Sequence, residues 1–274
     1  MYANLLVYLD LDRDNTALLK IVGDLAERFG AGVTGVTASQ PVRIIYGDGL
    51  LTGDIVELDR TEIRQAMAKA HEQFQAALQG RAKRLAWRSD VSAEMPTDYV
   101  ARQVRSADLV ITHTDYDKAY FDESRHVNAG NLIMQAGRPV LTVPAAAGSL
   151  AAKHLLVAWK DTSEARRAVA SALPFLKQAQ TVTVAEVTDT TLAEAPNGAR
   201  DVAEWLKLHG VPATSVVERA HGRSADQLLG IALANSADLI VAGAYGHNRL
   251  REWALGGVTY NLLAECGMCT LMSH

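Results

Sequence analysis

The stretch Ser236-Ala237-Asp238-Leu239-Ile240-Val241-Ala242-Gly243-Ala244-Tyr245-Gly246 joins a short apolar run to a glycine-rich turn. Its first four residues occur twice in the chain, because Ser106-Ala107-Asp108-Leu109 repeats them at an offset of 130. At the same offset Asn131-Leu132 matches Asn261-Leu262. Internal similarity at a fixed offset is typical of repeated structural units. We therefore expect two copies of one unit.

The offset changes upstream, where Leu5-Leu6-Val7 matches Leu155-Leu156-Val157 at an offset of 150. The first half thus carries about 20 additional residues, which we place in the glycine-containing segment Ser39–Asp59. A short run of alanine, glycine and serine forms a linker between the halves. The expected domains are residues 1–146 and 151–274.

Each half alternates short apolar runs, which are typical of buried strands, with longer segments whose apolar residues recur at helical spacing. This alternation predicts an α/β fold of two repeated, doubly wound domains, each with a mostly parallel five-stranded sheet. Ligands of such sheets bind beyond the carboxyl ends of the strands, where strand order reverses. The loops after Trp159, Val187 and Ala242 are therefore the expected site. The expected strands are Asn4–Leu9, Val33–Ala38, Leu85–Trp87, Leu109–Thr112, Val140–Val143, His154–Trp159, Thr181–Val187, Thr214–Glu218, Leu239–Ala242 and Cys269–Met272.

Composition excludes several classes of protein. The chain of 274 residues is 49% hydrophobic and 21% charged, which is ordinary for a globular protein. A net charge of −4 without a Lys/Arg block argues against nucleic-acid binding. The sequence has no unbroken apolar stretch long enough to predict a membrane span. The N-terminal segment lacks the features of a signal peptide. With only two cysteines, we expect a cytoplasmic protein.

The loop after the strand Leu239–Ala242 carries the strongest chemical signal. Gly243 and Gly246 open it, nine residues intervene, and Gly256-Gly257 leads through Val258 into a predicted helix that contains Thr259. Glycines let backbone N–H groups approach an anion, and a helix start adds unpaired N–H groups and a positive dipole end. These features predict a phosphate cradle. The structural alternative is a glycine-rich turn that binds nothing.

Polar residues inside this loop offer further contacts. His247 and Arg249 are candidates for phosphate binding, and a solvated charged turn is the alternative. The candidate phosphate-binding residues are Gly243, Gly246, His247, Arg249, Gly256, Gly257, Val258 and Thr259.

The loop resembles the motif of the universal stress protein family, in which Gly-x-x-Gly, nine residues and Gly-Ser/Thr bind the phosphates of ATP. Gly243, Gly246 and Gly256 match the three glycines. Gly257 stands where the family has Ser or Thr, whereas Thr259 matches a Ser or Thr two positions later. The resemblance covers nearly the whole chain and implies ATP, with Mg²⁺, as the ligand. Some members of the family bind ATP and others do not.

The resemblance also implies where a nucleoside would lie. Ala158, Trp159 and Val187 fall where the family lines its adenine pocket, and core packing at strand ends is the alternative. ATP-binding members have an acidic residue at the end of the first strand. This chain has Lys160 there, followed by Asp161, which either takes the acidic role or leaves Lys160 to meet phosphate.

The first half inverts this pattern. It keeps an acid, Asp10, at the end of its first strand, but His113, Tyr116 and His126 replace the three glycines of the loop. Because side chains there would obstruct a backbone cradle, we expect no nucleotide in the first half.

A polar or metal site is chemically feasible in the first half, since carboxylates and imidazoles are metal ligands. The residues concerned are Asp10, Asp12, His113, Asp115 and His126. Their spacing is not that of a compact metal motif. We therefore expect solvated loop side chains and no metal.

The pair Cys266-Gly267-Met268-Cys269 has the spacing of a redox motif but follows a predicted helix instead of opening one. We expect two inert, mostly buried thiols. No arrangement of nucleophile, base or paired carboxylates defines a catalytic centre.

These observations favour a stress-response protein that binds an adenine nucleotide in its second domain. The rival hypothesis is a nucleotide-free module of the same fold that recognises a protein or a metabolite. A redox or metal protein is a third possibility. Tandem members of the family pair their domains through the final edge strands, here Val140–Val143 and Cys269–Met272, and a homodimer is a further expectation.

Overall fold

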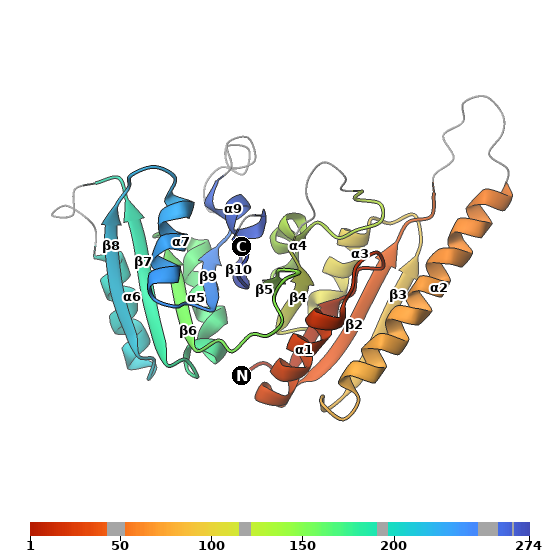
Figure 1. Cartoon of the computed structure of the whole chain (residues 1–274), viewed down its shortest axis with the longest axis horizontal. Helices are drawn as coiled ribbons and strands as arrows, with labels where there is room; N and C mark the ends of the chain where they lie inside the picture. Colours follow the sequence, from red (N-terminus) through yellow and green to blue (C-terminus); the bar gives the residue numbers. More distant parts are fainter. Residues whose placement is uncertain (43–52, 115–121, 191–196, 246–256, 265) are drawn as a thin grey trace.

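The computed structural model describes residues 1–42, 53–114, 122–190, 197–245, 257–264 and 266–274. Its strands form one continuous sheet in the order β3-β2-β1-β4-β5-β10-β9-β6-β7-β8 (Figure 1). The strands are β1 (Asn4–Tyr8), β2 (Gly32–Ser39), β3 (Leu85–Val91), β4 (Leu109–His113), β5 (Val140–Val143), β6 (His154–Trp159), β7 (Thr181–Thr188), β8 (Ala213–Arg219), β9 (Leu239–Gly243) and β10 (Thr270–Ser273).

The sheet consists of two five-stranded units that meet at a seam. Within each unit neighbouring strands are parallel. At the seam β5 and β10 run antiparallel, with Leu141 opposite Leu271. The predicted doubly wound α/β fold is confirmed. The seam strands coincide, to within a residue, with the two final edge strands named from the sequence.

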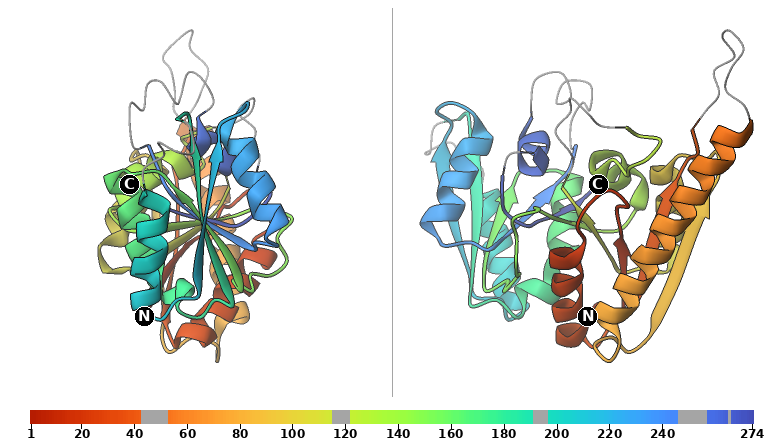
Figure 2. Two further views of the ribbon diagram at one scale, coloured as in Figure 1. Left: turned by 90° about the vertical axis from the view of Figure 1, so that its left-hand side faces the viewer. Right: turned by 45° about the vertical axis from the view of Figure 1, so that its right-hand side comes forward.

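Helices cover both faces of the sheet, as the edge-on view of Figure 2 shows. One apolar core lies under α1, α2, α5 and α6, and the other under α3, α4, α7 and α9. Both cores contain residues of both halves. The helices are α1 (Thr16–Phe29), α2 (Gly53–Leu78), α3 (Pro96–Gln103), α4 (Ala129–Ala136), α5 (Ser163–Leu176), α6 (Gly198–Leu208), α7 (Ser224–Ala234) and α9 (Val258–Ala264), and a 3₁₀ turn, η1, spans Val104–Ser106.

The central strands are buried on both faces, which explains why they read as unbroken apolar runs. The segment Ser39–Asp59, in which about 20 additional residues are expected, contains the end of β2 and the start of α2. Residues 43–52 of that segment lie outside the described part of the chain. Within the described residues, no helix is both long and apolar enough to cross a membrane.

The repeated Ser-Ala-Asp-Leu motif has one structural role in both halves. The carboxylate of Asp108 accepts hydrogen bonds from the backbone N–H groups of Ala3 and Asn4, at 2.7 and 3.0 Å. Asp238 accepts from Lys153 and His154 at 3.0 and 3.1 Å. Each aspartate therefore holds the entrance of the first strand of its own half beside the strand that the motif begins. The motif serves the fold and not the ligand site.

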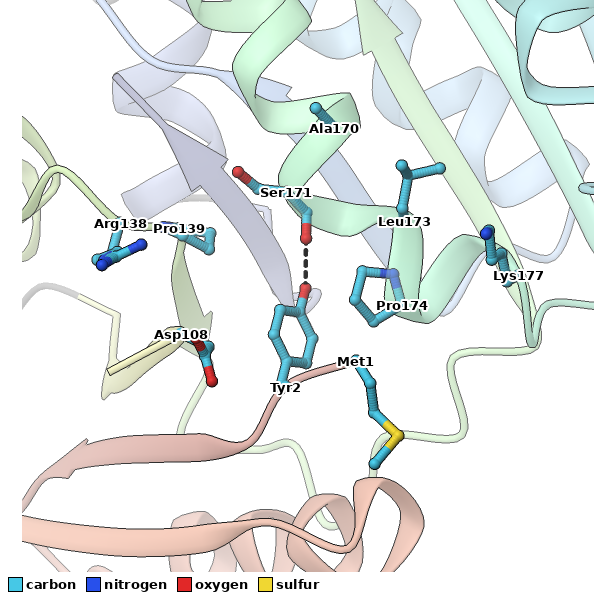
Figure 3. A pocket seen from close by; sticks show the side chains of 10 residues that line it. All are labelled: Met1, Tyr2, Asp108, Arg138, Pro139, Ala170, Ser171, Leu173, Pro174 and Lys177. Atoms are coloured by element: carbon cyan, nitrogen blue, oxygen red, sulfur yellow. Dashed lines mark hydrogen bonds between the residues drawn. The ribbon is translucent and has the colours of Figure 1, made fainter. Parts of the chain in front are cut away.

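Three aromatic rings join the halves at the amino ends of the strands. Tyr2 and Phe29 of the first half contact Phe175 of α5, with ring centroids 5.5 and 5.1 Å apart. The hydroxyl of Tyr2 donates a hydrogen bond of 2.7 Å to the carbonyl oxygen of Ser171 (Figure 3). Burial raises the pKa of Tyr2 far above its usual range. The two halves therefore share a hydrophobic contact in addition to the β5–β10 seam.

Candidate functional site

The predicted ligand site lies where the strand order of the second half reverses. β6 has β7 on one side and β9 on the other, and Ala158 is in register with Ala242. The chain leaves β6 toward α5 and leaves β9 toward α9, so both loops begin at the same edge of the sheet (Figure 1). In doubly wound sheets this crevice is the usual place for a ligand.

Gly243, the first glycine of the loop, is closely packed against α5. A Cβ atom at this position would overlap the backbone nitrogen of Ala165 and the carbonyl carbon of Glu164. Glycine is therefore required by the approach of two backbones. The side chain of Thr162 caps α5, accepting from the N–H of Ala165 at 3.2 Å. The end of β9 and the first turn of α5 are thus closely packed at the base of the site.

The two ends of the glycine-rich loop are tied together. The backbone N–H of Tyr245 donates a hydrogen bond of 3.3 Å to the hydroxyl of Thr259, which is buried in the first turn of α9. Tyr245 has a positive φ of 59°, a conformation that is uncommon outside glycine and places a sharp turn at the loop entrance. Thr259 therefore has a structural role that its sequence position did not indicate.

Tyr245 also contacts the first half of the chain. Its hydroxyl approaches Gly130 in α4 so closely that a Cβ atom on Gly130 would overlap it. The first residues of the loop thus rest on α4, immediately beyond the helix N-cap Asn128. This contact between the halves could not be predicted from the sequence, because nothing in the sequence pairs Tyr245 with Gly130.

The residues predicted to frame a nucleoside lie on different faces of the sheet. Ala158 and Val187 face the core under α7 and α9, whereas Trp159 faces the core under α5 and α6. Lys160 and Asp161 are exposed beyond the end of β6. The carboxylate of Asp161 accepts a hydrogen bond of 2.5 Å from the guanidinium of Arg166.

Part of the predicted loop lies outside the described residues. This applies to Gly246, His247, Arg249 and Gly256. Gly257 and Val258 are described and half-buried at the start of α9. Of the predicted phosphate-binding positions, Gly243 and Thr259 lie in the same region. Gly243 is packed against α5, and Thr259 is hydrogen-bonded to Tyr245.

A buried carboxyl at the end of β7 was missed in the sequence. Glu186 is 8% exposed, pairs in register with Trp159, and accepts a hydrogen bond of 3.3 Å from the N–H of Ala199 at the start of α6. The indole N–H of Trp159 is buried and has no hydrogen-bond partner among the described residues. Both side chains abut Gly198. The missed signal was that Glu186 occupies an inward position in the period-2 alternation of this strand.

Burial raises the pKa of Glu186, and the charge of Asp161 adds to the increase, against the opposing hydrogen bond from Ala199. The folded carboxyl therefore binds its proton more tightly than the unfolded one, so this group's contribution to stability is lost as the pH rises through the raised pKa. We expect Glu186→Gln to be more stable than the wild type above that pH and to show a smaller decline. Urea unfolding at a series of pH values measures both, with Glu204→Gln, an exposed position on α6, as the control. Parallel pH profiles for wild type and Glu186→Gln would contradict this prediction.

The two cysteines match the expectation of inert thiols. Cys269 is buried and Cys266 half-buried, and neither forms a disulfide. Burial raises the pKa of the Cys266 thiol and raises that of Cys269 to about 12. Since the thiolate is the reactive form, neither sulfur is activated at neutral pH.

The first half departs from expectation at its corresponding site. Asp10, His113 and His126 are 3%, 6% and 9% exposed, whereas we predicted solvated loop side chains. The reason is that the segment Asp122–His126 folds back over the ends of β1 and β2, where the backbone N–H of Gln40 donates to the carbonyl of Ser124 at 2.8 Å. Asp12 is exposed, and Asp115 lies outside the described residues.

A hollow between the halves lies at the opposite edge of the sheet, away from these sites. It is bordered by the amino ends of β1, β4 and β5 and by α5 (Figure 3). Arg138, Lys177 and Asp108 place charges of both signs around it, and Asp108 is already engaged with Ala3 and Asn4. These features do not define a particular ligand.

Two parallel five-stranded units, with a glycine-bearing loop at a point of strand-order reversal, define a tandem doubly wound α/β protein. Residues 151–271 match the model of the universal stress protein family. The second half of the chain is therefore a universal stress protein domain. No curated protein matches the chain.

Solved structures resemble the whole chain and not only its second half. A universal stress protein from Archaeoglobus fulgidus DSM 4304 superposes with a TM-score of 0.71 at 13% identity, covering 98% of this chain and 95% of the other. A functionally unknown protein from Pseudomonas aeruginosa PAO1 gives 0.60 at 15% identity, with coverages of 99% and 92%. The cytoplasmic domain of a prokaryotic cation chloride cotransporter gives 0.51 at 12% identity, covering 100% and 96%. At these identities the likeness establishes the shared fold.

Proposed function

We propose that the chain is a stress-response protein whose second domain, residues 151–274, binds an adenine nucleotide, ATP with Mg²⁺. The first domain, residues 1–146, does not bind nucleotide in this manner. The observation that carries the proposal is the hydrogen bond between the N–H of Tyr245 and Thr259, together with the close packing of Gly243 on α5. These contacts hold both ends of a glycine-rich loop at the strand-order reversal, where phosphate binding is expected.

The nucleoside would lie beside the carboxyl ends of β6 and β7. Ala158 and Val187 offer apolar contact on one face of the sheet. Lys160 is exposed and available to a phosphate. Asp161, the acid that follows Lys160, would have to leave its ion pair with Arg166 to meet a ribose hydroxyl.

Nucleotide binding would act as a signal. Because Tyr245 opens the loop and touches Gly130 of α4, a change in the loop would alter this contact with the first half. In this proposal the nucleotide-bound and nucleotide-free forms differ in the surface formed by the loop and α4, which a protein partner reads. We propose the cytoplasm as the location, since both cysteines are free thiols.

Calorimetric titration of the full chain with Mg-ATP tests the proposal. We expect saturable binding below millimolar concentration, lost in Gly246→Trp, which puts a bulky side chain at a predicted phosphate-binding glycine, and weakened in Thr259→Val, which removes the acceptor for Tyr245. The matched control is Thr181→Val, an exposed threonine at the opposite edge of the sheet. Absence of binding would overturn the proposal. Unchanged affinity in Gly246→Trp would place the nucleotide elsewhere.

The rival hypothesis, a nucleotide-free interaction module, is favoured by one observation. Lys160 stands at the end of β6, and the neighbouring carboxylate of Asp161 is held by Arg166. The same titration distinguishes the two hypotheses, because the rival predicts no heat of binding with ATP for wild type or variants.

A further inference from the structure

The first half contains a compact cluster of metal-ligating side chains at the carboxyl end of β1. Asp10 and Asp12 follow this strand, and His126 comes from the segment before α4, 116 residues after Asp10. One ligand atom from each of the three residues lies within 4.8 Å of the others. We propose that His126 and Asp12 bind a divalent transition-metal ion, with Zn²⁺ as the representative, and that Asp10 holds the imidazole in place.

The distances in the cluster suit such an ion. The Nδ1 atom of His126 is 3.2 Å from the carboxylate of Asp10, and its Nε2 atom is 3.5 Å from that of Asp12. With zinc–ligand bonds of about 2.0–2.2 Å, neighbouring ligand atoms of a tetrahedral site lie about 3.3–3.6 Å apart. The separation between His126 and Asp12 falls in this interval without rearrangement of the chain.

The imidazole is arranged as metal-binding histidines usually are. A ligating histidine commonly donates its other ring N–H to a buried carboxylate, which fixes the orientation of the ring. Here Nε2 faces the exposed Asp12, while Nδ1 faces the buried Asp10. An ion between Nε2 and Asp12 would retain the hydrogen bond between Nδ1 and Asp10, so that Asp10 would fix the orientation of the ring. Water would complete the shell.

The cluster is held in place from outside. His126 ends a turn in which its N–H and that of Arg125 both donate to the carbonyl of Asp122 at 3.0 Å. Arg125 forms an ion pair of 2.6 Å with Asp59 of α2. On the other side, the backbone N–H of Asp12 donates to the Asp10 carboxylate at 3.0 Å. Fixed ligands lower the entropic cost of binding an ion.

A second buried imidazole, that of His113, lies beside the cluster. His113 is 6% exposed, and its Nδ1 atom has no hydrogen-bond partner among the described residues. Its Nε2 atom lies 3.2 Å from the side-chain oxygen of Asn15, whose amide donates to the carbonyl of Asp10 at 2.8 Å. A buried, unpaired ring nitrogen is costly unless a ligand or bound water meets it. Burial lowers the pKa of His113 to about 4, so the ring is neutral at pH 7 and its free nitrogen can accept a bond.

Zinc titration of the untagged, EDTA-treated full chain by calorimetry tests the site. We expect one saturable Zn²⁺ per chain, with affinity reduced at least about tenfold in Asp12→Asn and in His126→Gln, since even the loss of outer-shell partners costs 10–100-fold. Asp12 is exposed, so Asp12→Asn keeps the test decisive if His126→Gln does not fold.

The controls are matched by residue type. Asp14→Asn changes an exposed carboxylate two positions from Asp12, and His221→Gln changes an exposed histidine of the second half. Both should bind Zn²⁺ as the wild type does. Cobalt(II) gives an independent signal, because its visible absorption should appear with the wild type and disappear in Asp12→Asn. Absence of saturable zinc binding, or equal affinity in wild type, Asp12→Asn and His126→Gln, would overturn the proposal.

Discussion

Phe175→Ala is expected to lower the free energy of unfolding by about 3–5 kcal/mol, the usual cost of emptying a fully buried phenylalanine site. Its ring contacts Tyr2 and Phe29 of the first half, and the guanidinium of Arg28 lies 5.7 Å from its centroid. The cavity would therefore open where the two halves join. Chemical denaturation monitored by circular dichroism measures the loss, and differential scanning calorimetry measures it independently.

The same experiment shows whether the halves unfold together. Since both hydrophobic cores contain residues of both halves, we expect one cooperative transition that moves as a whole. Tyr2→Phe is the mild control, because it keeps the ring and removes only the hydrogen bond to Ser171, worth about 0.5–1.5 kcal/mol. Two separate transitions, with only the second shifted by Phe175→Ala, would show that the shared core contributes little.

Gly243→Ala is expected to destabilise the fold by about 1–3 kcal/mol and to abolish the nucleotide binding proposed for the second half. The added methyl group would meet the backbone of Glu164 and Ala165, which cannot yield as a flexible side chain would. The end of β9 must then move away from α5, and the loop that begins there moves with it. Urea unfolding measures the first effect and Mg-ATP titration the second.

Gly230→Ala provides the matched control. Gly230 lies in α7, where a Cβ atom would meet open space, and its φ is not among the positive values. Alanine there should leave nucleotide affinity unchanged and stabilise the helix by about 0.5–1 kcal/mol. If Gly243→Ala is as stable as the wild type, the close approach of β9 to α5 is not a constraint on this position.

The sequence predicted the fold well because the evidence for it is local or repeated. Apolar runs located the central strands within a residue or two, as for His154–Trp159 and Val140–Val143. The repeat predicted two copies of one unit, and its Ser-Ala-Asp-Leu motif proved to hold the first strand of each half in place. Pairing between the copies was implied by family resemblance alone, since hydrogen bonding between edge strands leaves no pattern in either strand.

The site was less predictable because its contacts join distant positions. Gly243 was interpreted as a position where backbone approaches phosphate, yet the neighbour that excludes a side chain is α5. Asp10 and His126 were named as metal candidates but expected to be solvated. Their burial depends on how the segment Asp122–His126 folds over the sheet, which spacing does not reveal. Glu186 was not named, although it occupies an inward position in the alternation of its strand.

The antiparallel seam between β5 and β10 gives the two halves the relationship of subunits in a twofold dimer, within one covalent chain. In a homodimer every substitution appears twice, so both sites must tolerate it. Here each half can change alone while the partner surface is retained. The chain can therefore keep glycine at 243 on one side and place Asp10 and His126 at the equivalent end of the other, with no requirement that either arrangement function in two copies.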